Sequence, residues 1–264
     1  GLGERESRRR IGRVRLPLER RHAGGRVGAG TVVNPPGGPA LQPTVTFSGT
    51  EHLSVVAQSA DADIFRITGT TNSDTFELTP GASIDTFTAT GFSVGAGAFN
   101  FVPVTFSGFR AFIAAPTNFG PVGGSDTLIV NGTSADDVIT LLPQTGFLAF
   151  PAITVNGSTE ITFGSIAGKV DEVILRGLEG NDTFNIAFDA TTDAQFRDLT
   201  VRVQGGDSDA SSDVLNYTGT GGNISIDFQN QVLTEVGFGP VAFTGVERLN
   251  VDAANADVVV LGGP

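Results

Sequence analysis

The sequence contains no Cys, no Met and no Trp, and it has a single Tyr, Tyr217. The absence of Cys excludes disulfide bonds and thiol chemistry, although it leaves export from the cell open. With one Tyr and no Trp, the chain lacks the usual aromatic platforms of sugar-binding grooves. We expect its 20 Phe residues to build apolar core ladders instead. No uninterrupted apolar run reaches the roughly 18 residues of a membrane-spanning helix, so we expect no such helix.

Lys is almost absent as well, and the charges are divided sharply along the chain. Residues 1–40 hold nine Arg and three Glu, whereas residues 41–264 hold seven basic and 25 acidic residues. The acidic part argues against nucleic-acid binding, because neutralising phosphates takes clustered Lys and Arg. We interpret 1–40 as a disordered Arg-rich tail that ends in a Pro- and Gly-rich linker, and 41–264 as one repeat domain.

What the sequence has in abundance is a heptad that opens with Asp and closes with Gly. It occurs at residues 63–69, 126–132, 171–177, 213–219 and 257–263. Eleven residues after the opening Asp, the first three copies continue to a second Asp, namely Asp74, Asp137 and Asp182. Units that cannot bury an apolar face alone stack on one another, so the repeat predicts a stacked all-β fold. Because the last copy runs into the C-terminus and position 1 is not Met, we expect a piece of a longer array, truncated at its C-terminus.

The spacing of the heptads predicts how the strands are arranged. Successive opening Asp residues are 63, 45, 42 and 44 residues apart. These gaps are close to multiples of about 21–22 residues, which we interpret as one turn of a right-handed parallel β-solenoid. Residues 41–264 would then form about ten irregular turns. The alternative is a pair of antiparallel β-sandwich domains, which also have short strands every 8–12 residues or so.

The heptad also predicts which side chains are buried. Residues two and four positions after each Asp fall on one side of a strand, so they are expected to face the core. The Asp carboxylate suits a turn because it accepts hydrogen bonds from nearby N–H groups, and the closing Gly permits a close backbone approach. The residues predicted to be buried are Phe65, Ile67, Phe76, Leu78, Leu128, Val130, Ile139, Leu141, Val173, Leu175, Phe184, Ile186, Leu215, Val259 and Leu261.

One turn carries a motif with chemical content. Gly177-Leu-Glu-Gly-Asn-Asp-Thr-Phe-Asn185 resembles the nonapeptide of hemolysin-type (RTX) calcium-binding repeats, although Leu178 stands where that family has its second Gly. The resemblance implies calcium held by turn carbonyls and Asp carboxylates, since this cation takes six or more oxygen ligands. Asn181 and Asp182 are the candidate ligands in this turn.

Two further acidic turns are candidate calcium sites. Asp136 and Asp137 lie in a weaker copy of the same turn, and Asp207, Asp209 and Asp213 alternate in a loop that could surround one ion. Relief of the repulsion among the acidic charges of the body would favour such binding. The other interpretation is that these Asp residues form turns and accept hydrogen bonds from their own backbone.

Residue patterns typical of catalysis are missing. The sequence has no nucleophile elbow, Walker loop or HExxH helix, and its two His residues are His22 and His52. Asp171 and Glu172 are neighbours in an expected strand, so they point to opposite faces and cannot flank one glycosidic bond. We therefore expect that the protein is not an enzyme.

The repeats as a whole suggest a cellular role. Degenerate Gly- and Asp-rich turns joined by elements such as Phe243-Thr-Gly-Val-Glu247 are similar to those of large repetitive surface proteins of planctomycete-type bacteria. That resemblance implies a non-catalytic structural or adhesive segment of an exported protein at the cell surface, stabilised by calcium. Its expected partners are other repeats of the same chain and cell-surface or extracellular matrix components. The alternative is a β-helix protein that binds or degrades polysaccharide.

Overall fold

The computed structural model describes residues 28–32, 45–56, 64–70, 72–95, 99–109, 111–115, 124–143, 151–158, 160–163, 170–188, 197–206 and 212–261. Every regular element in these ranges is a strand, which confirms the all-β prediction. Most of the predicted disordered tail lies outside the described residues. Within it, however, β1 (Gly28–Val32) forms a strand that pairs antiparallel with β2 (Val45–Thr50). The described part of the chain has no helix that is long and apolar enough to cross a membrane.

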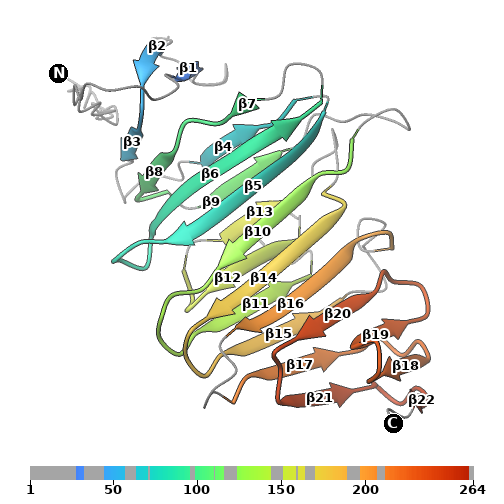
Figure 1. The fold of residues 1–264 in the computed structure, drawn as a ribbon. Coiled ribbons are helices and arrows are strands. Elements are labelled where there is room, and N and C mark those ends of the chain that lie inside the picture. The colour runs from blue at the N-terminus through green and yellow to red at the C-terminus, as the bar shows by residue number, and fades with distance from the viewer. Residues whose placement is uncertain are drawn as a thin grey trace, which may run out of the picture.

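Two large sheets make up the rest of the described structure (Figure 1). Sheet I consists, in spatial order, of β3 (Leu53–Val56), β8 (Val104–Ser107), β6 (Thr86–Val94), β5 (Ser73–Pro80), β10 (Thr127–Asn131), β14 (Glu172–Leu178), β16 (Thr200–Gly206), β20 (Val241–Thr244), β19 (Val232–Glu235), β18 (Ile224–Asp227) and β22 (Val258–Leu261), with β7 (Phe99–Asn100) beside β6. Sheet II consists of β4 (Ile64–Thr68), β9 (Ala111–Ala115), β13 (Glu160–Phe163), β12 (Ala152–Val155), β11 (Val138–Leu142), β15 (Thr183–Ala187), β17 (Val214–Thr218) and β21 (Arg248–Asp252).

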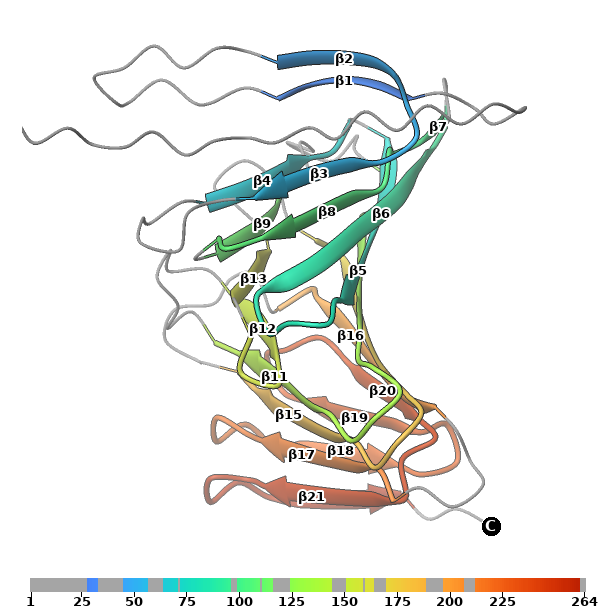
Figure 2. The same ribbon diagram turned by 90° about the vertical axis from the view of Figure 1, so that its left-hand side faces the viewer.

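The chain advances along the two sheets from one end of the molecule to the other. In Figure 2 the colours run from blue at one end, near β1 and β2, to red at the other, near β21. The inward side chains of both sheets belong to one continuous cluster, which includes Leu128 and Val173 from sheet I and Ile139 and Phe184 from sheet II. The core therefore lies between the sheets, and alternate side chains of each strand build it, as expected for strands with one buried face.

Parallel pairs connect strands that are far apart in the sequence. Thr127 of β10 lies opposite Glu172 of β14, and Val138 of β11 lies opposite Thr183 of β15, so both pairs join residues 45 positions apart. Across all parallel pairs of the described residues the separation ranges from 28 to 52. The predicted turn of about 21–22 residues is wrong, because one interval of about 45 residues places one strand in each sheet before it returns.

Antiparallel hairpins interrupt the parallel rows. β5 and β6 pair over eight residues each, β11 is followed by β12 and β13, and β18 and β19 precede β20. The less regular stretches that separate the heptads in the sequence form these hairpins. Because each hairpin adds strands to a sheet, the sheets are mixed, and the intervals between heptads vary in length.

Most of the burial predictions are confirmed. The side chains buried as predicted are Phe76, Leu78, Leu128, Val130, Ile139, Leu141, Val173, Leu175, Phe184, Ile186 and Leu215. Phe65 and Ile67 of β4 are only partly buried against the core, since β4 is the outermost strand of sheet II and has one neighbour among the described strands.

The predictions for Val259 and Leu261 are wrong, because these side chains are 53% and 49% exposed. Both belong to β22, where Val259 lies opposite Ser225 and Leu261 opposite Asp227 on the solvent side of the sheet. The alternate residues of β22 continue the rows of the buried Ile224 and Ile226 instead. The fifth heptad is thus shifted by one residue relative to the others, and such a shift exchanges the two faces of a strand.

Candidate functional site: two carboxylate ladders

A row of acidic side chains joins successive strands of sheet I. The backbone N–H of Asp74 donates to Oδ1 of Asp126 at 2.8 Å, and the N–H of Asp126 donates to Oδ2 of Asp171 at 2.9 Å. The three residues lie at or just before the starts of β5, β10 and β14. We call this row the first carboxylate ladder.

A second carboxylate ladder does the same for sheet II. It consists of Asp137, Asp182, Asp213 and Glu247, which precede β11, β15, β17 and β21. The N–H of each of the first three donates to a carboxylate oxygen of the next residue, at 2.8, 2.8 and 2.7 Å. The three Asp side chains are almost fully buried, so these N–H groups would otherwise lack a partner away from water. Each carboxylate therefore fastens one strand to the next.

The closing Gly of the heptad makes room for these carboxylates. A Cβ added at Gly177 would lie 2.0 Å from Oδ2 of Asp182 and 2.4 Å from the carbonyl oxygen of Gly205. At Gly132 it would lie 2.6 Å from Oδ2 of Asp137. No side chain fits at such distances, so Gly and the Asp five residues later form one structural unit. The Gly is required for this close approach, whereas the sequence indicated only that a close approach was permitted.

The buried position of the ladder affects its protonation. Burial raises the pKa of Asp182 to about 6, and the neighbouring charges of Asp213 and Asp137 raise it further against the hydrogen bond from the N–H of Asp137. Burial also raises the pKa of Asp213. Oδ2 of Asp182 and Oδ2 of Asp213 are buried without a hydrogen-bond partner. The second ladder thus carries carboxylates whose ionised form is disfavoured.

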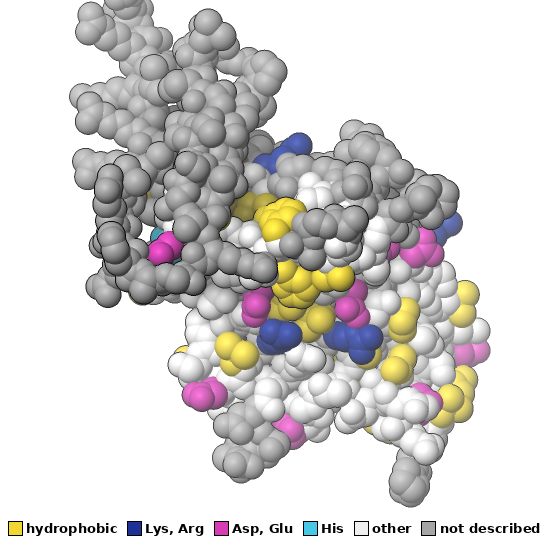
Figure 3. All heavy atoms as spheres, turned by 45° about the horizontal axis from the view of Figure 1, so that its top comes forward, with side chains coloured by type: hydrophobic (Ala, Val, Ile, Leu, Met, Phe, Trp, Pro, Cys, Tyr) yellow, Lys and Arg dark blue, Asp and Glu magenta, His cyan; other side chains and the backbone are white. Residues whose placement is uncertain are grey.

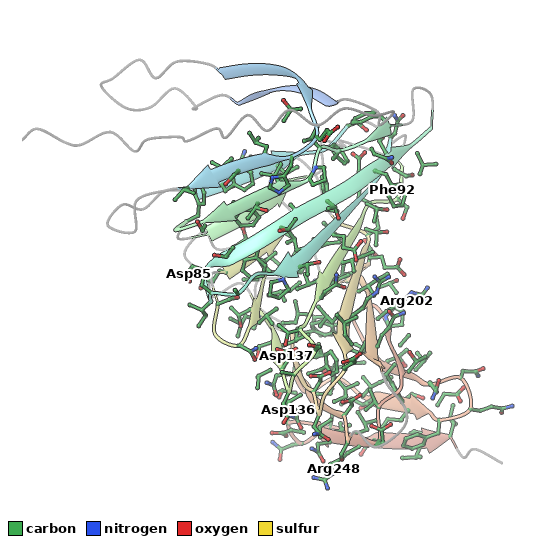
Figure 4. The ribbon with its side chains drawn as sticks, turned by 60° about the vertical axis from the view of Figure 1, so that its left-hand side comes forward. Asp85, Phe92, Asp136, Asp137, Arg202 and Arg248 are labelled. Carbon is green, nitrogen blue, oxygen red and sulfur yellow. The ribbon has the colours of Figure 1, made fainter. Side chains whose placement is uncertain are left out.

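An exposed row runs beside the second ladder. Asn181 donates its N–H to Oδ1 of Asp136 at 2.8 Å and its side-chain amide to the same oxygen, while its own Oδ1 accepts the N–H of Ser212. The hydrogen bonds from Asn181 hold the pKa of Asp136 below its usual value. Figure 4 shows Asp136 next to Asp137 at this edge of the fold. The exposed row repeats the connection between strands that the buried ladder makes.

The predicted calcium ligands divide into two groups. Asp136, Asp137, Asn181, Asp182 and Asp213 lie at neighbouring levels of this edge, where their side-chain oxygens accept hydrogen bonds from the backbone. Within the described ranges, no three acidic or His side chains converge on a point that could hold an ion. These five residues are therefore arranged as hydrogen-bond acceptors, and they do not fit a calcium site of six oxygens.

The other two predicted ligands, Asp207 and Asp209, lie outside the described residues.

Sequence reasoning missed one buried acid, Glu235. Its Oε2 accepts the hydroxyl of Tyr217 at 2.7 Å, and its Oε1 accepts the N–H and hydroxyl of Thr220 and one further N–H of that turn. Burial and the bond to Glu235 raise the pKa of Tyr217. Gly219 closes a heptad but is followed five residues later by Ile224, so Glu235 supplies the carboxylate from hairpin β18–β19. The missing Asp at position 224 was the available signal.

Comparisons with protein-family models, with curated protein sequences and with solved structures find no match to this chain. The functional argument therefore depends on the geometry of the chain itself.

Proposed function

We propose that the chain is a non-catalytic structural or adhesive repeat segment of an exported bacterial surface protein, folded as an irregular right-handed parallel β-solenoid. The observation that carries the proposal is the commitment of the repeated acids. In both ladders the Asp of the heptad bonds the backbone of the neighbouring strand, so the most regular feature of the sequence serves assembly. A stack held in this way provides a rod, and its partners would be further repeats and components of the cell surface or matrix.

The competing proposal of a polysaccharide-degrading enzyme lacks a specific observation in its favour. Asp171 accepts the N–H of Asp126 within the first ladder, whereas Glu172 forms an ion pair with Arg202 on the outer face of sheet I. The two acids thus act at different places, as the alternation of strand side chains predicts. We infer that neither serves as an acid or base towards a bound sugar.

The absence of Cys makes the parallel arrangement directly testable. Thr140 and Asn185 are register partners on β11 and β15, and the Asn185 amide donates to the Thr140 hydroxyl at 3.2 Å. Neighbouring strands are about 4.8 Å apart, which lies within the range that a disulfide spans. We expect the double variant Thr140→Cys, Asn185→Cys to form an intramolecular disulfide on mild oxidation, detected by mass spectrometry of the digested protein.

The matched control is Thr140→Cys with Asn216→Cys. Asn216 lies one strand further along the same row, roughly 10 Å from Thr140, and should not form the bond. Equal cross-linking of the two pairs, or none in the first, would contradict the proposed stack.

Calcium remains part of the proposal for the loop that contains Asp207 and Asp209. If an ion binds there, it stabilises the folded chain by about 2.7 kcal/mol at 100 times its dissociation constant. We expect thermal melts of the full chain to show a higher midpoint in millimolar calcium than in EGTA, and Asp207→Asn with Asp209→Asn to remove the difference. Superimposable melts of the parent chain would show that these acids form turns only.

A further inference from the structure

The outer face of sheet I has an aromatic feature that the core does not use. Phe92 of β6 is 44% exposed, although most Phe side chains in the described residues contribute to the interior. In register, Phe92 lies opposite Thr75 of β5 on one side and Asn100 of β7 on the other. Directly paired residues share a face, so the ring, the hydroxyl and the amide lie together on the solvent side.

These residues line a half-open hollow of about 280 Å³ across β5, β6 and β7. Glu77 and Thr90, which are register partners two positions further along, complete its polar lining. The floor is backbone at Gly91, where a Cβ would lie 2.3 Å from the carbonyl oxygen of Thr75. The hollow thus has one aromatic wall and a ring of hydroxyl, amide and carboxylate groups.

The charges of this face are largely compensated. Glu77 pairs with Arg176 at 3.3 Å and accepts the amide of Asn131 at 2.9 Å. Figure 3 shows a hydrophobic patch bordered by basic and acidic side chains, and Figure 4 places Phe92 and Arg202 on the same side of the fold. The whole chain carries a net charge of −12, which repels polyanions at long range. A neutral ligand is therefore favoured over an acidic one.

We propose that this hollow binds a neutral hexopyranose unit of a polysaccharide. The apolar C–H face of a pyranose packs on the exposed ring of Phe92. Its hydroxyl groups match the hydroxyls of Thr75 and Thr90, the amide of Asn100 and the carboxylate of Glu77, which provide both donors and acceptors. The proposal rests on the adhesive role proposed above, for which it supplies a site and a ligand class. A cationic peptide is less suitable, because the carboxylate already has an Arg partner.

The test is calorimetric titration of the full chain with cellohexaose and with laminarihexaose. We expect at least one of them to bind, and Phe92→Ala to weaken that binding at least about tenfold. Phe228→Ala is the matched control, because Phe228 is 47% exposed but lies after β18, outside the hollow. It should leave the affinity unchanged. Because Phe92 is exposed, both variants should keep the circular dichroism spectrum and melting midpoint of the parent.

Three results would overturn the proposal: neither hexasaccharide binds, binding survives Phe92→Ala, or only polygalacturonate or oligolysine binds. The disulfide experiment is independent of this site. Failure of the cross-link with retained sugar binding would reject the proposed stack and keep the hollow, whereas the opposite pair of results would keep the stack and reject the hollow.

Discussion

Replacing Gly177 with Ala is expected to destabilise the protein by about 3 kcal/mol or more. The added methyl group would lie 2.0 Å from Oδ2 of Asp182 and 2.4 Å from the carbonyl oxygen of Gly205. Neither atom is at the end of a long flexible side chain, and Gly205 is itself in close contact with the backbone of Gly245. The strain therefore spreads into two neighbouring strands. Urea unfolding followed by circular dichroism measures the loss as a lower midpoint.

Gly157→Ala is the control for this substitution. A Cβ at Gly157 would meet no heavy atom within 4 Å, but its φ of +68° is unfavourable for Ala. It should cost only about 1–2 kcal/mol, the usual penalty of the left-handed conformation. Similar losses in the two variants would show that the contact with Asp182 is not tight.

The second large effect expected is an increase in stability on mild acidification that depends on Asp182. Its folded pKa of about 6 lies above the unfolded value near 3.9, so the folded state binds more protons between these values. The unfolding free energy must then rise as the pH falls through this window. After allowance for solvent screening, we expect a gain of about 1–2 kcal/mol from pH 7.5 to pH 5, measured by urea unfolding at both values.

Asp182→Asn isolates this contribution. The amide keeps an oxygen that can accept the N–H of Asp137 but does not titrate, so most of the gain should disappear. Asp85→Asn removes an exposed acid and should behave like the parent chain. A parent protein that is less stable at pH 5, or an Asp182→Asn variant with the full gain, would contradict the assignment.

The sequence predicted the strands of this fold better than their partners. Alternation around each Asp correctly identified buried residues such as Phe76, Leu128 and Phe184, because the two faces of a strand are a local property. The choice of neighbouring strand is a long-range property. Two strands per interval of about 45 residues gave a false period of half that length, and nothing local distinguished strands of sheet I from those of sheet II.

The candidate site was predictable in its residue types and not in its bonds. Asp137 and Asp182 were recognised as turn formers, yet their acceptance of hydrogen bonds from a strand 45 or 31 residues away has no local signal. The same limit applies to Glu235, which reaches its turn from a hairpin. Phe92 was expected in an apolar core ladder, and only the pairing with Thr75 and Asn100 shows that it faces solvent.

The unequal separation of parallel strands has a consequence for how such chains can change during evolution. The path from the Gly to the Asp of a heptad is short and tightly packed, whereas the return from sheet II to sheet I ranges from a plain loop to a hairpin of two strands. Insertions in the return path leave every ladder bond in place. Duplication, loss or lengthening of one segment therefore disturbs only its immediate neighbours, and the family of viable sequences should vary widely in length while keeping the Gly–Asp corner.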